Sequence, residues 1–328
     1  MTTTSEKKFR YELQSTPAGA RKRRSPGAEA PDWFVAALAD EPETGTTVVD
    51  GTSVAWRAWG PARGAGVVLV HGGAAHARWW DHIAPALVEG GRRVVAVDLS
   101  GHGDSGRREE YDLDAWAAEV AGVVAAMGFR APPVVIGHSM GGFVTLKLAA
   151  RLGRGLAAAI VVDSPVRELT REERELRAAR VVPRQPKVHE SFESAVRRFR
   201  PIPDQEVLDY VAAHIARHSL RPVPDGWVWK FDTGIYGREF LEPGQVDPVE
   251  CRVVLVRGQH GMLTGRMSAA LRERLGGTAT EIEIPDAGHH IMLDEPLSLI
   301  ATLRGMLDDE PLRAGSAEQE DAAAMPSA

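Results

Sequence analysis

The sequence predicts an α/β protein with a doubly wound, mostly parallel sheet and a helical cap inserted after the sixth strand. Short apolar runs rich in β-branched residues alternate with longer stretches of helical periodicity. Continuously apolar runs are typical of strands covered by helices on both faces. The strand–helix alternation implies right-handed crossovers and therefore parallel strands. One long break in this alternation predicts the cap.

The predicted sheet begins with an antiparallel hairpin at one edge, because Asp50-Gly51 is a turn sequence between two strand-like runs. The last run alternates apolar and polar residues, which places it at the other edge. Two amphipathic helices are expected at 113–127 and 143–152. The expected strands are 46–50, 53–59, 67–70, 94–97, 134–136, 159–162, 253–256 and 280–284.

From Pro165 to about Pro248 no strong strand run occurs. Charged helical patterns at 171–180, 190–199 and 204–217 and a Trp-rich stretch take its place. An insertion of about 80 residues is too long for a crossover, and it predicts a lid over the carboxyl ends of the strands, where such sheets bind ligands. The predicted domains are a core of 32–164 and 249–308, a cap of 165–248, and disordered tails of 1–31 and 309–328.

Composition excludes several classes of protein. The 328 residues carry 39 Lys and Arg against 45 Asp and Glu, so the net charge of −6 argues against binding nucleic acid. A single cysteine, Cys251, rules out an internal disulfide and fits a reducing compartment. No apolar run of about 18 residues and no signal peptide are evident. We therefore expect a cytoplasmic protein with a small-molecule substrate and no nucleic-acid or membrane partner. Homo-oligomerisation and the role of the basic run at 21–24 stay open.

The sharpest motif is Gly137-His138-Ser139-Met140-Gly141-Gly142, directly after a predicted strand and before a predicted helix. A serine hydroxyl is a poor nucleophile unless it is exposed, oriented and partnered with a base. A tight strand-to-helix turn exposes the serine, and glycines at the flanking positions let the strand and helix pack closely. This context predicts that Ser139 is a nucleophile.

With this motif, the chain resembles the α/β-hydrolase family over about residues 45–308. The other matching segments are Val70-His71-Gly72-Gly73, Asp98 to Ser105, and Ala287-Gly288-His289-His290, in the family's order and spacing. The resemblance implies a serine hydrolase with a cap domain and without a cofactor or metal.

His289 is the predicted base, because imidazole has a pKa near neutral pH and the loop after the last strand can bring it over the strand ends. The resemblance places the catalytic histidine first in the pair, so His289 is preferred over His290. A pair of capping histidines is the alternative. By the same resemblance, the backbone N–H groups of Met140 and Gly73 form the oxyanion hole. A plain tight turn also explains Gly72-Gly73.

The triad acid departs from the commonest family pattern. In many members it lies three residues past the glycine that ends the seventh strand, a position occupied here by Gly261. Some members place the acid after the sixth strand instead, where this chain has Asp163. We predict Asp163, since an acid must hold the imidazole in one tautomer. Asp247 or Glu250, or a mere capping role for Asp163, remain alternatives.

The predicted substrate-binding residues are Trp79, Trp80, His138, Trp227 and Trp229, with core packing as the rival role for the tryptophans. Asp98 and Asp104 are predicted to bond turn amides rather than to act in catalysis. His214 and His218 share a helical face but lack a third ligand, so no metal site is predicted. Arg197, Arg198 and Arg200 are predicted to form a solvated face.

The expected function is hydrolysis of a carboxylic ester or lactone through an acyl-enzyme. Carbon–carbon bond hydrolysis and cofactor-free haloperoxidase-like perhydrolysis use the same triad and stay open. A non-catalytic, hydrolase-like small-molecule binding protein is the alternative from another class, because no acid follows the seventh strand. Enzymes of this fold that need an aspartate nucleophile are excluded by Ser139.

Overall fold

A computed structural model describes residues 29–180, 185–236 and 240–309. The basic run at 21–24 and nearly all of the two predicted disordered tails lie outside these residues, so those predictions stay untested.

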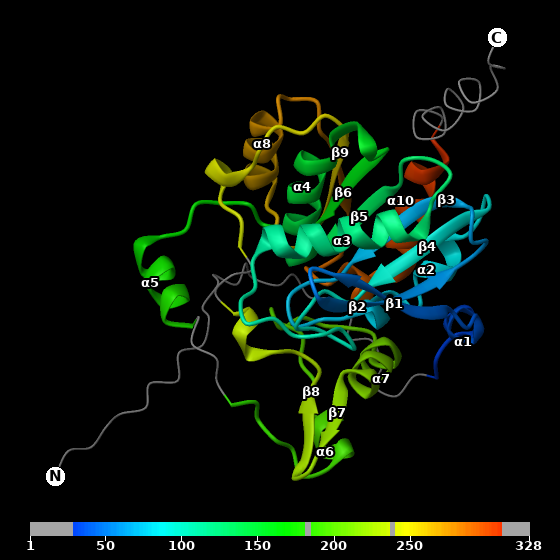
Figure 1. Cartoon of the computed structure of the whole chain (residues 1–328), viewed down its shortest axis with the longest axis vertical. Helices are drawn as coiled ribbons and strands as arrows, with labels where there is room; N and C mark the ends of the chain where they lie inside the picture. The colour runs from blue at the N-terminus through cyan, green and yellow to red at the C-terminus, as the bar shows by residue number, and fades with distance from the viewer. Residues whose placement is uncertain (1–28, 181–184, 237–239, 310–328) are drawn as a thin grey trace.

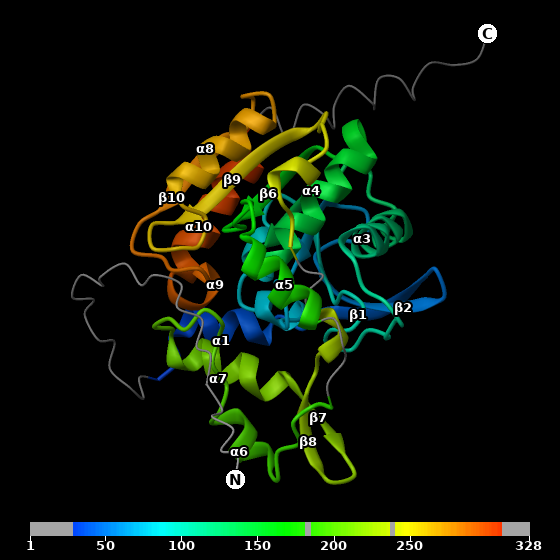
Figure 2. The ribbon, with the colours of Figure 1, turned by 90° about the vertical axis from the view of Figure 1, so that its left-hand side faces the viewer.

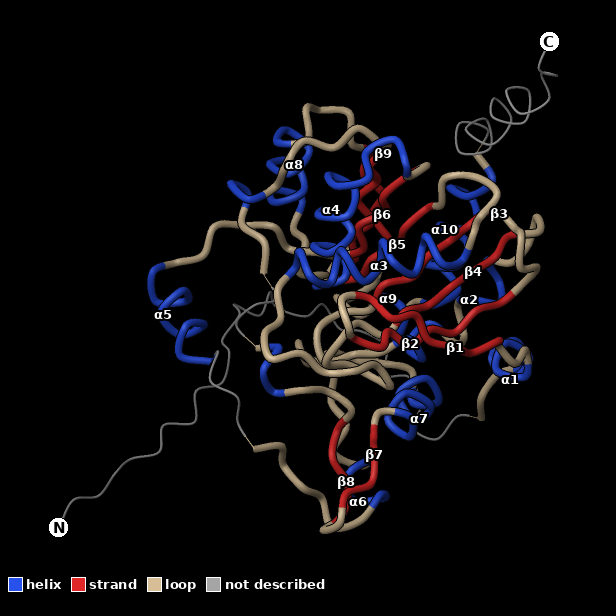
Figure 3. The backbone as a smooth tube through the Cα atoms, in the orientation of Figure 1, coloured by secondary structure: helices blue, strands red, loops and turns tan. Residues whose placement is uncertain are grey.

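The central element is an eight-stranded sheet in the order β1-β2-β4-β3-β5-β6-β9-β10 (Figures 1 and 3). The hairpin β1–β2 is antiparallel and forms one edge, β2 pairs antiparallel with β4, and all later pairs are parallel. This confirms the predicted parallel sheet, its edge hairpin and its amphipathic last strand. The strands are β1 Glu43–Val49, β2 Thr52–Trp59, β3 Ala65–Val70, β4 Arg92–Val97, β5 Val134–His138, β6 Ala158–Val162, β9 Arg252–Gly258 and β10 Thr280–Ile284.

Both faces of the sheet are buried, which explains the continuously apolar strands. In β3, Val67 and Leu69 belong to one hydrophobic cluster, while Val68 and Val70 belong to a second cluster on the opposite face. Successive strand side chains point to opposite faces, so a strand covered on both sides needs apolar residues throughout.

Helices α1, α2, α9 and α10 contribute to the first cluster, and α3, α4 and α8 contribute to the second. Figures 1 and 2 show α3 and α4 together on one side of the sheet. The predicted helices at 113–127 and 143–152 correspond to α3 and α4. The helices of the core are α1 Asp32–Ala39, α2 Ala84–Leu87, α3 Leu113–Met127, α4 Met140–Leu152, α8 Gly265–Arg274, α9 Ile291–Asp294 and α10 Pro296–Asp308, with short 3₁₀ turns η1 Ala77–Trp80 and η2 Gly153–Gly155.

The segment between β6 and β9, called the insertion here (residues 165–248), is not only helical. It contains α5 Arg171–Arg180, α6 Phe192–Val196, α7 Asp209–His218 and two 3₁₀ turns, η3 Thr233–Ile235 and η4 Pro243–Gln245. The Trp-rich stretch forms an antiparallel hairpin, β7 Leu220–Val223 and β8 Gly226–Trp229. The sequence prediction missed this hairpin, although Pro224-Asp225-Gly226 is a turn signal between two apolar runs.

The insertion contacts loops that follow the carboxyl ends of parallel strands. The Gly103 N–H, in the loop after β4, donates to the Lys230 carbonyl at 2.8 Å, and Leu208 N–H donates to the Leu293 carbonyl after β10 at 2.8 Å. In Figure 2, α6, α7 and the β7–β8 hairpin lie at one end of the sheet. This position is the one in which open α/β sheets bind ligands.

Candidate active site

Ser139 occupies a strained turn between β5 and α4. Its φ of 55° and ψ of −120° place it in a region that L-residues rarely adopt. The neighbouring glycines are required by space, because a Cβ at Gly137 would collide with the Gly141 carbonyl oxygen and one at Gly142 with the Ser164 hydroxyl. The glycines thus let β5 and α4 approach, and the turn leaves Ser139 partly exposed.

The structure brings Ser139, His289 and Asp163 together in one hydrogen-bonded chain. The Ser139 hydroxyl lies 3.0 Å from His289 Nε2, and His289 Nδ1 lies 2.6 Å from Asp163 Oδ2. A carboxylate can only accept, so the proton of the neutral imidazole lies on Nδ1 and Nε2 carries the lone pair. That lone pair faces the serine hydroxyl, as removal of its proton requires.

Asp163 is fully buried at the end of β6, with a φ of 45° that turns its side chain towards the loop after β9. Besides His289, its carboxylate accepts from the N–H groups of Met262 (2.7 Å), Gly258 (3.2 Å) and Leu263 (3.4 Å). Together with the His289 ring, these N–H groups satisfy the acceptor oxygens of this buried carboxylate.

Gly261 is explained by the same geometry. A Cβ at this position would lie 2.5 Å from Asp163 Cγ and 2.6 Å from Oδ2. The carboxylate from β6 therefore occupies the space into which an acid at position 261 would point. A carboxylate thus faces the imidazole from the end of β6 instead of from position 261.

The alternative acids lie elsewhere. Asp247 pairs with Lys147 at 3.1 Å and Glu250 lies 3.7 Å from Arg154, both on the surface. Asp98 accepts from the N–H groups of Ala77 (2.6 Å) and Asp104 (2.8 Å), as predicted. The Asp104 carboxylate instead pairs with Lys230 of the insertion at 2.5 Å, so the prediction of a turn amide partner is wrong for this residue.

Two residues that the sequence prediction missed hold the loop that carries His289. The Gln205 amide oxygen, from the insertion, accepts from His290 N–H at 2.8 Å, and Asp294 Oδ2 accepts from Gly288 N–H at 2.6 Å. Gln205 Nε2 also donates to Asp294 at 3.0 Å. A Cβ at Gly288 would lie 2.9 Å from the Gln205 oxygen, so a larger residue there would displace the Gln205 side chain. The insertion thus fixes the histidine loop directly.

Of the two predicted oxyanion donors, Met140 directly follows Ser139 in the chain. Met140 begins α4, so its N–H is among the first groups of the helix, which have no partner within the helix. The His71-Gly72-Gly73 loop passes close by, because a Cβ at Gly72 would lie 3.2 Å from Ser139 Cβ.

Comparison with known proteins shows the family to which this fold belongs. A family model described as the alpha/beta hydrolase family matches residues 67–303. The chain belongs to this family. It is 27% identical over 249 residues to the esterase Rv0045c of Mycobacterium tuberculosis, which covers 74% of this chain and 82% of that protein. Over 121 residues it is 38% identical to a non-heme chloroperoxidase of Streptomyces lividans, and this aligned region makes up 37% of this chain and 44% of that protein.

Among solved structures, the thioesterase domain from the curacin biosynthetic pathway matches this α/β hydrolase with a TM-score of 0.68 and 21% identity, and covers 80% of this chain and 98% of that one. That likeness concerns the fold. The curated relatives are esterases, lipases and haloperoxidases, so the chain is a hydrolase and they support ester hydrolysis. Within the described ranges, no helix combines the length and apolar character of a membrane span.

The aromatic residues of this hydrolase connect the insertion to the histidine loop. The Trp79 ring lies 5.4 Å from His290 and 6.2 Å from Phe199, and Phe199 lies 6.1 Å from Trp229 of β8. Trp227 packs instead on Phe192 of α6, at 5.0 Å. Trp80 is fully buried in the core, which fits the packing role. Substrate contact stays a prediction for Trp79 and Trp229.

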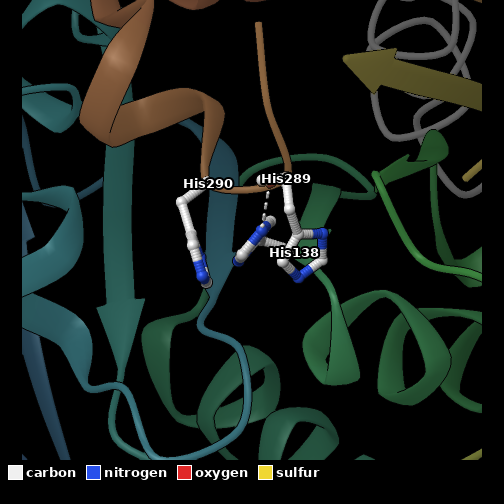
Figure 4. Close-up of side chains that lie close together, drawn as sticks. All are labelled: His138, His289 and His290. Carbon is white, nitrogen blue, oxygen red and sulfur yellow. Dashed lines mark hydrogen bonds between the residues drawn. The ribbon is translucent and has the colours of Figure 1, made fainter. Parts of the chain in front are cut away.

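Figure 4 shows His138, His289 and His290 side by side. His138 Nε2 lies 2.9 Å from the His289 carbonyl oxygen, to which it donates. Burial and the neighbouring His289 hold the pKa of His138 well below its usual range. Burial likewise lowers the pKa of His290, followed by the effects of His289 and His138. Both side chains are therefore neutral at neutral pH.

A cavity of about 330 Å³ lies elsewhere, between the β1–β2 hairpin, the loops after β3 and β4, and the insertion. Its lining includes Arg57, Asp98 and Lys230 and none of the predicted site residues. His218 also lines it, bonded to the His214 carbonyl at 2.8 Å, while His214 binds Asp81 at 3.1 Å. These contacts give the histidine pair a structural role. Arg197, Arg198 and Arg200 are exposed, as predicted.

Proposed function

We propose that this chain cleaves a carboxylic ester or lactone through an acyl-enzyme, with Ser139 as nucleophile, His289 as base and Asp163 as acid. The observation that carries the proposal is the continuous chain of hydrogen bonds from the Ser139 hydroxyl through His289 to the buried Asp163 carboxylate. Its residues come from three different loops, and the strain at Ser139 fits a functional site.

In the proposed reaction, His289 Nε2 takes the hydroxyl proton while Ser139 Oγ attacks the carbonyl carbon. The N–H groups of Met140 and Gly73 stabilise the oxyanion. The imidazolium then gives its proton to the leaving alcohol, and the acyl group stays on Ser139. In the second half, His289 takes a proton from water as the water oxygen attacks the acyl carbon. The bond to Ser139 Oγ then breaks, the imidazolium returns its proton to Oγ, and the acid is released. Asp163 remains ionised and holds Nδ1–H throughout.

A hydrophobic acyl or alcohol group is the proposed substrate class. Beside the histidine loop, the rings of Trp79, Phe199 and Trp229 lie next to one another. Such a lining favours apolar groups over a sugar or a peptide.

A fluorophosphonate probe together with a panel of p-nitrophenyl esters tests the proposal. We expect labelling and ester turnover in the native protein and loss of both in Ser139→Ala. Ser164→Ala is the matched control, because this buried serine follows β6, lies against Gly142 of α4 and is hydrogen-bonded to the Val162 carbonyl rather than to His289. A native protein that neither reacts with the probe nor turns over an ester would be a non-catalytic binding protein.

Perhydrolysis is a second candidate, favoured by the 38% identity to a non-heme chloroperoxidase. Formation of a peracid from acetate and hydrogen peroxide, followed by halide oxidation, detects it. If the fluorophosphonate probe labels the protein but neither ester nor peracid turnover is detected, carbon–carbon bond hydrolysis by the same residues is favoured. Turnover of a vinylogous diketone tests that activity.

A further inference from the structure

His138, His289 and His290 form a buried cluster of imidazoles. One ring nitrogen from each lies within 4.8 Å of those of the other two, and no side chain of the three is more than 5% exposed. Within the described part of the chain, this is the one group of three or more His, Cys, Asp or Glu side chains so arranged. Figure 4 shows that the rings converge from two elements, the end of β5 and the loop before α9.

Each imidazole has a nitrogen lone pair to offer. His138 must carry its proton on Nε2 in order to donate to the His289 carbonyl, so the lone pair lies on Nδ1, which has no hydrogen-bond partner. His289 keeps its lone pair on Nε2, because Nδ1–H is directed at Asp163. Neither ring nitrogen of His290 makes a hydrogen bond of normal geometry. The Ile202 carbonyl lies near the His290 ring, and if the ring proton points at this carbonyl, the second ring nitrogen keeps its lone pair.

Buried polar atoms without partners are rare and call for an explanation. Here the unpartnered atoms are the atoms that divalent transition metals bind, in the neutral form that binding requires. Tetrahedral Zn²⁺ with Zn–N bonds of about 2.0–2.1 Å needs nitrogens about 3.3 Å apart. The ring nitrogens of the cluster lie up to 4.8 Å apart, so the rings must move closer to bind an ion, and no hydrogen bond of normal geometry holds the His290 ring in place.

Two further features suit a metal. Asp163 binds the far nitrogen of His289, which is the carboxylate–histidine arrangement that orients metal-bound imidazoles. Ser139 is partly exposed and its oxygen lies 3.0 Å from His289 Nε2. A metal ion can thus enter by the route that a substrate takes, and the serine oxygen or a water can complete four ligands.

We propose that His138, His289 and His290 bind a divalent transition metal such as Zn²⁺, and that the bound ion inhibits the enzyme. The metal takes the Nε2 lone pair of His289, so this nitrogen can no longer accept the serine proton. Binding by neutral imidazoles displaces the Ser139–His289 hydrogen bond and involves no redox change. The inhibitory part rests on the proposed function, whereas binding of the metal does not.

The test separates binding from inhibition. Zn²⁺ binding to metal-free Ser139→Ala protein is measured by calorimetry, and Co²⁺ is used as a spectroscopic probe of coordination. We expect one ion per chain and a visible Co²⁺ spectrum of a tetrahedral site. Loss of one ligand in His290→Phe should weaken Zn²⁺ binding by at least roughly 100-fold, above the range for loss of an outer partner. His290→Leu repeats the measurement if the larger ring perturbs folding.

His260→Ala is the matched control, because His260 is an exposed histidine outside the cluster. It should bind Zn²⁺ as the native protein does. In the native enzyme, Zn²⁺ should inhibit ester turnover reversibly, with recovery after addition of EDTA. Each variant's inhibition is expressed relative to its own metal-free rate.

Equal Zn²⁺ affinity in His290→Phe, His290→Leu and native protein would overturn the site, and so would loss of binding in His260→Ala alone. Tight binding that leaves ester turnover unchanged would overturn the inhibitory role. A native protein that binds Zn²⁺ through the cluster but hydrolyses no ester would refute the proposed function and leave the metal site standing.

Discussion

Replacing Asp163 by asparagine tests the core of the proposed mechanism. The Asp163 carboxylate faces four donors: the Nδ1–H of His289 and the N–H groups of Gly258, Met262 and Leu263. An asparagine side chain has one acceptor oxygen and one NH₂ group, so its NH₂ must face some of these donors. Directed at the imidazole, the NH₂ favours the tautomer with its proton on Nε2, which cannot accept the serine proton.

The size of the effect follows from this geometry. A wrong tautomer in a Ser-His-Asp triad costs about 10⁴-fold in kcat, or about 5 kcal/mol at about 1.4 kcal/mol per tenfold change. Directed at the backbone instead, the NH₂ leaves buried N–H groups unpaired, at a cost of about 1–3 kcal/mol in the free energy of unfolding. We expect a fall in kcat of about three to four orders of magnitude and a lowered urea midpoint.

The assay is kcat for a p-nitrophenyl ester, with circular dichroism to confirm folding. Asp247→Asn is the control: this exposed carboxylate pairs with Lys147, and loss of a surface pair costs at most about 1 kcal/mol of stability. Its kcat should equal that of the native enzyme. A folded Asp163→Asn variant with kcat within about tenfold of native would refute the reasoning, since the tautomer argument then fails.

Three other predictions follow from the packing and the charges. Gly261→Ala forces a Cβ to within 2.5 Å of the Asp163 carboxylate. This overpacking should lower the free energy of unfolding, measured by urea titration, by about 1–3 kcal/mol, and it should also lower kcat. An unchanged urea midpoint together with an unchanged kcat would contradict this prediction. Gln205→Leu leaves the backbone N–H of His290 unpaired, so kcat should fall and the free energy of unfolding, measured by urea titration, should fall by about 1–3 kcal/mol. A native kcat in this variant would show that the insertion does not position the histidine loop. Burial lowers the pKa of His82 and of His102 to about 4, so the folded protein binds fewer protons than the unfolded chain below pH 6.5, and stability falls as the pH drops. Each of these two histidines should lower the free energy of unfolding by about 2 kcal/mol between pH 6.5 and 5. Burial raises the pKa of Asp98 to about 6, so protonation of Asp98 stabilises the folded protein by about 1 kcal/mol between pH 6.5 and 5 and offsets part of this loss. A urea midpoint as high at pH 5 as at pH 7 would contradict the prediction.

Much of the fold is predictable because its signals are local. The strands of the core are read from runs of apolar residues, and the Ser139 turn from glycines within three positions of the serine. Both depend on the backbone preferences and side-chain volumes of neighbouring residues, which the sequence displays directly. The β7–β8 hairpin also has a local signal, Pro224-Asp225-Gly226, and was missed because the surrounding helical patterns dominated the prediction.

The contacts between loops could not be predicted in the same way. His289 and Asp163 are 126 positions apart, and His290 and Gln205 are 85 apart. Whether such side chains meet depends on how the sheet, the insertion and the terminal loop pack, at a precision of about an ångström.

The sequence alone therefore determined the layered sheet, the serine turn and the family to which this hydrolase belongs, since each rests on a pattern of adjacent residues. Only the tertiary structure decided which carboxylate faces the imidazole, why position 261 must be glycine, and that three histidines converge beside the serine. These depend on distances between segments remote in the chain, and such distances exist only once the chain has folded.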